Sequence, residues 1–315
     1  MRHLGIALLF TAVSVSGQEA PAADAPTPTR LRKVIDWITT NVEVRQTFDG
    51  SKEEQKPATV AYVQNADVKD SFYQIDFAIR VGERDLARHS ERHQLNLSPT
   101  AEWHRTSTPK PVDTISGKLQ LEHIYGKLRE YDEFGVEDTR VGGETDIGWV
   151  TVLRAGPVRD RQQNVTSGDA SITFTIKSHR PGYPNSFVNL RDGSRIFRYA
   201  PHLGVDYYSN KPVFVGTTET AGIDLALARA NLNMAFYPFN RDNTNRREIL
   251  FEYTYFHHLA GDDRLGSMRF WTAQANYYLD QAGRVAIGYT YERGENPTKK
   301  FLRVRQSSVG LRIKL

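Results

Sequence analysis

Val309-Gly310-Leu311-Arg312-Ile313-Lys314-Leu315, the last seven residues, place an aliphatic side chain at every odd position and glycine or a cation at every even one. Successive side chains of a β-strand point to opposite faces, so this stretch predicts a strand with one apolar face and one polar face. In a membrane-spanning barrel, the apolar face of such a strand contacts lipid. The stretch therefore predicts that the chain ends in a barrel strand.

The first residues predict export. Arg2 and His3 precede an apolar stretch over residues 4–15, and small residues follow at Ser16 and Gly17. This order is typical of a secretory signal peptide, which we place at residues 1–17. Residues 18–32, rich in Ala and Pro, predict a flexible periplasmic segment. The remainder, residues 33–315, is predicted to form one domain, a transmembrane β-barrel.

Composition excludes several other classes. The chain has no cysteine, so it offers neither a disulfide nor a lipoprotein acylation site. Mean hydropathy is −0.53, and no stretch after the signal approaches the roughly 20 apolar residues of a membrane helix. A barrel strand faces lipid with only every second residue, so a polar average is compatible with a barrel. Helical membrane proteins are excluded and barrels are not.

Alternation with a period of two recurs in segments of about ten residues, the length that a tilted membrane strand requires. Tyr73, Ile75, Phe77, Ile79 and Val81 form one such apolar face. Similar alternation is found over residues 95–104, 171–177, 249–255, 271–280 and 285–292. These segments predict antiparallel strands in an all-β fold.

Other segments have strand-forming composition but mixed faces. They cover residues 34–48, 57–66, 117–131, 144–155, 194–209, 223–239 and 300–315. Together with the regular segments they give about thirteen candidates, whereas single-chain bacterial barrels have an even number of strands. Twelve strands is the first expectation and fourteen the second, with residues 186–190 and 212–218 as possible additional strands.

The connections suggest an orientation. If the C-terminus is periplasmic, the short links at residues 280–283 and 240–245 also lie on the periplasmic side. The charged links at residues 259–268 and 293–300 then lie outside, where longer loops are usual. We therefore expect short connections at the end of the barrel that holds the C-terminus.

With its signal peptide, alternating strands and apolar C-terminal residue, the mature chain resembles Gram-negative outer-membrane β-barrel proteins of the porin-like kind. The resemblance implies contact with outer-membrane lipids and lipopolysaccharide. It also implies insertion by the barrel-assembly machinery, which recognises the last strand. The usual final residue of the class is Phe, whereas this chain ends in Leu315. No particular family, substrate or oligomeric state follows from the resemblance.

Charge gives the first indication of function. The net charge is +4, and 29 of the 41 cations are arginine, whose guanidinium suits carboxylates and phosphates. Inside a barrel such cations favour anions. The polar faces give these channel-lining candidates: Asp76, Arg80, Glu102, Lys177, Glu252, Gln274, Asn276, Glu292, Arg312 and Lys314. They predict either a passive channel for small polar solutes with a preference for anions, or a non-conducting structural barrel filled by ion pairs.

A lipid hydrolase is the enzymatic alternative, because such an enzyme needs a serine and a histidine base near the lipid interface. His257 and His258 end a predicted strand, and Asp262, Asp263 and Ser267 follow in a predicted loop. Their spacing matches no hydrolase motif, and a polar barrel rim explains them equally well. We expect no enzymatic activity and assign no catalytic residue.

Other sites find little support. Gly142-Gly143 lacks the lysine and helix of a phosphate-binding loop. His89 and His93 are four residues apart but are expected in a loop, so no metal site and no cofactor is predicted. Basic residues alternate with acids along the chain, which disfavours nucleic-acid binding. For the fold, a soluble periplasmic β-sandwich is the alternative that alternation leaves open.

Overall fold

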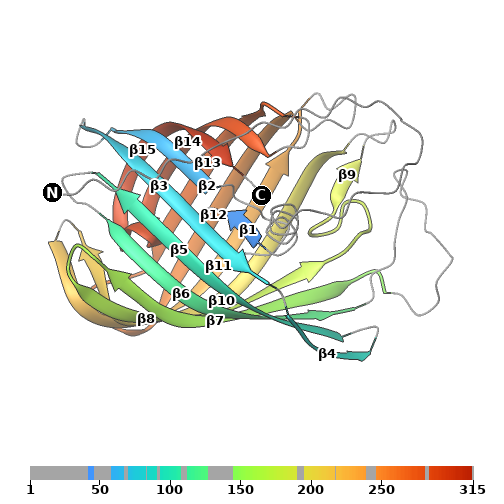
Figure 1. Cartoon of the computed structure of the whole chain (residues 1–315), viewed down its shortest axis with the longest axis horizontal. Coiled ribbons are helices and arrows are strands. Elements are labelled where there is room, and N and C mark those ends of the chain that lie inside the picture. The colour runs from blue at the N-terminus through green and yellow to red at the C-terminus, as the bar shows by residue number, and fades with distance from the viewer. Residues whose placement is uncertain are drawn as a thin grey trace, which may run out of the picture.

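The computed structural model describes residues 42–45, 58–66, 70–82, 84–90, 93–107, 112–126, 145–189, 195–216, 218–238, 246–280 and 284–313. The chain folds into a closed antiparallel β-barrel (Figure 1). Its wall consists of β2 (Ala58–Asn65), β3 (Asp70–Val81), β5 (His93–Thr106), β6 (Asp113–Tyr125), β7 (Gly148–Asp160), β8 (Val165–Lys177), β10 (Arg195–Val215), β11 (Thr218–Phe236), β12 (Arg247–Gly261), β13 (Met268–Tyr278), β14 (Val285–Asn296) and β15 (Leu302–Ile313). The predicted all-β barrel of twelve strands is confirmed.

Each wall strand pairs with the wall strand that follows it in the chain, and β15 closes the barrel against β2. The closing register runs from Gln306 opposite Asn65 to Ile313 opposite Ala58. In Figure 1 the red C-terminal strands lie beside the blue and cyan N-terminal ones. Closure leaves no unpaired edge in the wall, as a membrane barrel requires.

Three short strands extend the wall. β1 (Val42–Arg45) pairs with the part of β3 beyond the reach of β2. β4 (Arg84–Ser90) continues β3 after Gly82 and pairs with β5. β9 (Phe187–Asn189) pairs with the first residues of β10. The possible strand at residues 212–218 instead overlaps the end of β10 and the start of β11, and of the candidate at 34–48 only β1 lies within the described residues.

The two faces of the wall have opposite chemistry. Exposed apolar side chains cover the outside, among them Tyr62, Leu119, Leu203, Ile287 and Val309. Polar side chains dominate the buried inner face, among them Gln74, Asn96, Gln120, Thr254 and Gln306. A soluble β-sandwich would bury its apolar face instead. This inverted distribution is what a barrel in lipid requires.

The lengths of the connections at the two ends of the barrel are the reverse of what the sequence predicted. We call the end of the barrel where β15 finishes the terminal end, and the opposite end the far end. The connections at the far end are all short, such as residues 161–164 and 216–217. The longest ones, residues 126–147 and 178–194, are at the terminal end. The expectation of short links at this end was wrong, because it rested on links near the C-terminus alone.

The interior is not polar throughout. Near the far end, side chains from β10 to β13 and from the β14–β15 connection form the inner apolar cluster: Tyr208, Val213, Ile223, Leu225, Leu227, Phe256, Leu265, Met268 and Phe301. Apolar side chains facing a wide water-filled lumen would be exposed, whereas these are buried. The described part of the chain contains no helix long and apolar enough to cross a membrane.

Candidate functional site: a charged cavity beneath an inserted loop

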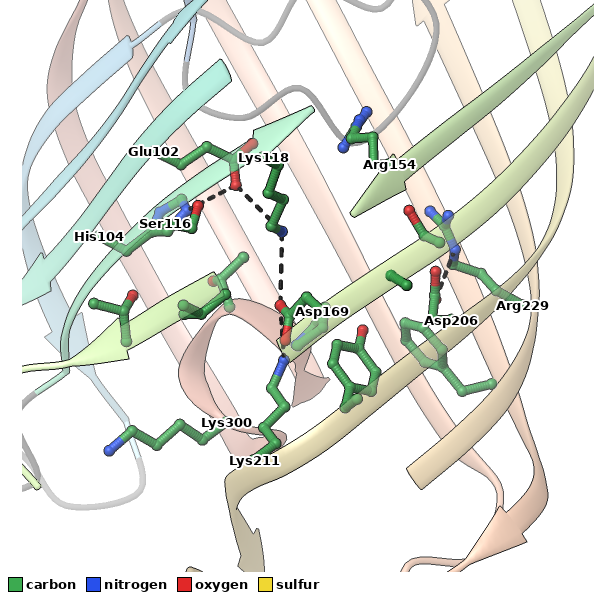
Figure 2. A pocket seen from close by; sticks show the side chains of 18 residues that line it. Glu102, His104, Ser116, Lys118, Arg154, Asp169, Asp206, Lys211, Arg229 and Lys300 are labelled. Atoms are coloured by element: carbon green, nitrogen blue, oxygen red, sulfur yellow. Dashed lines mark ion pairs between the residues drawn. The ribbon is translucent and has the colours of Figure 1, made fainter. Parts of the chain in front are cut away.

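A cavity of about 120 Å³ lies inside the barrel (Figure 2). Side chains from β5, β6, β7, β8, β10, β11 and β12 and from the β14–β15 connection line it. Alternation along the strands turns most of the strand residues inward. Its charged lining comprises Glu102, His104, Lys118, Arg154, Asp169, Asp206, Lys211, Arg229 and Lys300. Five of these are Lys or Arg and three are carboxylates. Lys300 pairs with Asp160 and Glu219, which lie outside the lining, so the other four cations exceed the three carboxylates by one.

Alternating charges run along one side of the cavity (Figure 2). Lys118 Nζ lies 3.8 Å from Glu102 Oε2 and 3.6 Å from Asp169 Oδ2. Lys211 Nζ lies 3.7 Å from the same Asp169 oxygen. These separations exceed those of good hydrogen bonds, and all four side chains are largely buried.

The charge row continues onto β3. His104 Nδ1 lies 2.9 Å from Asp76 Oδ1, and His104 Nε2 lies 3.9 Å from Glu102 Oε2. These three side chains are all largely buried inside the barrel. The imidazole therefore bridges two carboxylates on neighbouring strands.

The opposite side of the cavity holds a tighter pair. Arg229 Nε lies 3.0 Å from Asp206 Oδ2, and Arg229 also donates to Thr173 Oγ1 over 2.7 Å. Arg154 Nε donates to Gln120 Oε1, a neutral acceptor, over 3.1 Å. Arg154 is 5% exposed. Guanidinium groups thus face the cavity from two separate strands of the wall.

The β14–β15 connection, residues 297–301, folds into the barrel, and we call it the inserted loop. Its first part is the short helix η1 (Pro297–Lys299), followed by Lys300 and Phe301 with φ of 57° and 59°. Non-glycine residues adopt this left-handed region at an energetic cost, so surrounding contacts must hold the loop in place.

Those contacts reach strands around the barrel. Lys299 Nζ donates to Gln74 Oε1 on β3 over 2.9 Å, and Lys300 forms ion pairs with Asp160 on β7 and Glu219 on β11. The backbone amide of Phe214 donates to the carbonyl of Lys300 over 2.8 Å. The loop thus reaches across the barrel interior at the far end.

The ring of Phe301 fixes the tip of the inserted loop. Its centroid lies 5.8 Å from that of Tyr208 and 5.8 Å from that of Phe256, both in edge-to-face geometry. Phe301 is 2% exposed. The inserted loop is therefore held in place by packing of Phe301 in the inner apolar cluster. The link predicted at residues 293–300 does lie at the end opposite the C-terminus, but residues 293–296 belong to β14, and Lys299 and Lys300 are buried.

The structure places most channel-lining candidates on the inner face. Their side chains are buried or half-buried inside the barrel, and the group comprises Asp76, Arg80, Glu102, Lys177, Glu252, Gln274, Asn276, Glu292 and Arg312. Lys314 lies outside the described residues. Of this group, only Glu102 lines the cavity. Arg312 donates to Gln274 and Thr290, and Arg80 donates to Glu43 on β1. That these residues line a conducting path stays a prediction.

The alternation of inward and outward positions along each strand could have identified several cavity residues that the sequence analysis missed. Lys118, Asp169 and Lys211 each lie at an inward position of a wall strand. Lys118 lies in a segment with mixed faces, and the segments that held the other two were not predicted as strands. What marks these residues as a site is their proximity across β6, β8 and β10, which no single segment reveals.

The residues of the hydrolase alternative lie at the far end of β12 and β13. His257 and Ser267 extend the β12–β13 register outward, and His257 Nδ1 is 3.3 Å from Ser267 Oγ. Both side chains are exposed. Hydrogen bonds from Arg264 lower the pKa of Asp262 to about 2. Within the described residues, His257 contacts no carboxylate.

The proposed loop pair His89 and His93 lies in strands β4 and β5 instead. His93 Nδ1 is 3.2 Å from His123 Nε2, and the two rings stack. Among the described residues, no group of three or more His, Cys, Asp or Glu side chains could hold a metal ion.

Taken together, a closed antiparallel barrel, an apolar outer wall and a polar interior define an outer-membrane β-barrel protein of the porin-like kind. No family model and no curated protein matches the sequence.

Among solved structures, the chain is similar to the NanC porin, with 9% identity, coverage of 82% of this chain and 100% of that chain, and a TM-score of 0.42. The β domain of the Bordetella autotransporter Brka has 9% identity, coverage of 87% and 98%, and a TM-score of 0.39. The anion-selective porin from Comamonas acidovorans has 9% identity, coverage of 87% and 98%, and a TM-score of 0.37. Identities and TM-scores this low assign the chain to no family.

Proposed function

We propose that the protein is a passive outer-membrane channel for small polar solutes, with a preference for anions. The observation that carries the proposal is the cavity lining, in which four Lys or Arg side chains, besides the paired Lys300, face three carboxylates. A solute crossing the barrel meets this excess positive charge in a confined space. Fixed positive charge lowers the barrier for anions and raises it for cations.

The long ion-pair distances in the cavity favour a conducting channel rather than a structural barrel whose interior is permanently filled. Lys118 and Lys211 share Asp169 at 3.6 and 3.7 Å, so one carboxylate serves two ammonium groups. A passing carboxylate or phosphate can compete with Asp169 for these two ammonium groups and leave again. Binding that is favourable but weak is what conduction requires.

Planar-bilayer recordings test the proposal. We expect discrete conductance steps and, under a KCl gradient, a reversal potential of the sign set by chloride permeability. A barrel without steps would be the structural barrel of the alternative hypothesis. A reversal potential of the cation-selective sign would overturn the role of the lysines and arginines.

Substitutions at the shared carboxylate sharpen this test. Asp169→Asn removes the negative charge between the two lysines, so the permeability ratio of chloride to potassium should rise by about twofold or more. Lys118→Gln combined with Lys211→Gln should lower the same ratio. Arg105→Gln is the control, because Arg105 is exposed on the outer wall and should leave the ratio unchanged. Equal ratios in all these variants would contradict the proposal.

The contact between His257 and Ser267 supports a second candidate, a lipid hydrolase at the outer surface. The pair offers a nucleophile and a base, but no described carboxylate orients the imidazole. Fatty-acid release from phospholipid micelles should remain at background for the purified protein. A measurable rate that Ser267→Ala abolishes would instead establish the hydrolase.

A further inference from the structure

Two histidines lie side by side on the outer wall at the terminal end. His93 is the first residue of β5, and His123 lies close to the end of β6. Asn96 on β5 and Glu122 on β6 are buried on the inner face, so alternation places both histidines on the outer face. His93 is exposed and His123 is half-buried. We call these two residues the histidine pair.

Strand register holds the pair together. His93 lies opposite Tyr125, and Leu95 lies opposite His123, so the two histidines are diagonal neighbours on one face of the ladder. His93 Nδ1 is 3.2 Å from His123 Nε2. The pairing of β5 with β6 runs without a register shift from His93 to Arg105. The backbone that carries both imidazoles is therefore fixed before any ligand arrives.

The contact between the two rings is a weak hydrogen bond. A neutral imidazole has one N–H and one nitrogen lone pair, so one ring donates to the other. The nitrogens are at the long limit of hydrogen-bond distances, and His93 is exposed to competing water. A change of tautomer in one ring would place a lone pair on both nitrogens. Little stability is lost when the two nitrogens serve a common ligand instead.

The separation of the two nitrogens suits a metal ion. Tetrahedral Zn²⁺ binds imidazole nitrogen at about 2.0–2.1 Å, which places two ligating nitrogens about 3.3–3.4 Å apart. The observed 3.2 Å is close to this value, so only a small adjustment of the rings is needed. Among the described residues, no third His, Cys, Asp or Glu joins the pair. Water therefore fills the remaining coordination positions.

Aromatic rings flank the pair and indicate its surroundings. The ring centroid of Tyr125 lies 4.7 Å from that of His93 in edge-to-face geometry, and 4.0 Å from that of Trp149 in stacked geometry. Tyr and Trp side chains are typical of the boundary between the hydrocarbon core and water. An aqueous ion can therefore reach the pair, and a bound ion would lie close to the indole of Trp149.

We propose that the histidine pair binds one divalent transition-metal ion through His93 Nδ1 and His123 Nε2, with water as the other ligands. Imidazole suits Zn²⁺, Ni²⁺ and Cu²⁺, and the general order of affinities makes Cu²⁺ the tightest of the three. The site is independent of the proposed channel, because it lies on the opposite face of the wall from the lumen. A bound ion links β5 to β6 and stabilises the folded barrel by mass action.

Titration of the folded, tag-free protein in detergent with CuCl₂, followed by tryptophan fluorescence, tests this proposal. We expect saturable quenching with one ion bound per chain. His93→Ala and His123→Ala should each weaken binding by roughly tenfold or more, and the double variant should lose little further, because either substitution alone removes the chelate. His257→Ala is the matched control, since it removes an exposed histidine at the far end and should bind as the unaltered protein does.

Two further measurements define the site. Electron paramagnetic resonance of the Cu²⁺ complex should show coupling to two imidazole nitrogens, and coupling to one alone would overturn the chelate. Zn²⁺ should raise the urea midpoint of the unaltered protein and leave that of the double variant unchanged. Unchanged affinity in the double variant would place the ion elsewhere, and equal loss in His257→Ala would mean scattered surface histidines; either result overturns the proposal. Heat-modifiable gel migration verifies that each variant is folded.

Discussion

Replacing the inserted loop, residues 297–301, with a two-residue Asn-Gly turn should raise the single-channel conductance severalfold. The loop lies inside the barrel and extends from β14 and β15 to partners on β3, β7 and β11, so its removal widens the path at the far end. Asn296 and Leu302 are already paired across the hairpin, and a two-residue turn suits such a pair. Conductance in planar bilayers is the measurement.

Smaller changes to the loop should have a related effect. Lys300→Gln removes the ion pairs to Asp160 and Glu219 while keeping the length of the loop. Because the left-handed backbone at residues 300 and 301 depends on surrounding contacts, we expect more frequent transitions to a larger open state. Arg264→Gln, on an exposed loop at the same end, is the control and should leave the recordings unchanged. If the shortened loop gave the same conductance as the unaltered protein, the inserted loop would not be the constriction.

Gly294→Ala should cause the largest loss of stability of any single substitution considered. Gly294 lies in β14 with φ of +114°, and an added Cβ would be 1.9 Å from the carbonyl oxygen of Arg269. Backbone cannot move aside as a flexible side chain can, so the β13–β14 pairing must separate. We expect a loss on the order of 3 kcal/mol or more from backbone strain and overpacking combined.

Urea unfolding of the barrel in lipid vesicles, followed by tryptophan fluorescence, measures this loss. Gly266→Ala is the matched control, because Gly266 lies at the same end of the barrel and an added Cβ there would meet nothing within 4 Å. The free energy of unfolding of this control should change little. Similar unfolding curves for both variants would show that β14 tolerates a side chain at this position.

The barrel and its two faces could be predicted from sequence because each depends on alternation within one strand. Tyr73 and Ile287 are exposed on the outer wall, and Asp76 and Glu102 are buried inside, as the local pattern indicated. The alternation of inward and outward side chains can be recognised in one strand without knowing which strand is its neighbour. Segments with mixed faces gave less information, because an inner apolar residue such as Leu227 belongs to a cluster assembled from several strands.

The candidate site depends on relations between strands, which local patterns do not contain. The contact of Lys118 with Asp169 joins β6 to β8, and the shared position of Lys211 adds β10. Register and strand tilt bring these residues together. The inserted loop is a stronger case, because its charged sequence is typical of an exposed link. The loop folds inward because the ring of Phe301 packs against the rings of Tyr208 and Phe256.

Closure of the wall between β15 and β2 has a consequence for biogenesis. The eight residue pairs of this seam join opposite ends of the polypeptide. A nascent chain still attached to the ribosome before β15 is made would carry two bare strand edges, on β2 and β14, with no partner inside the molecule. Closure of the barrel must therefore wait until β15 is available, and until then both edges need protection from other chains.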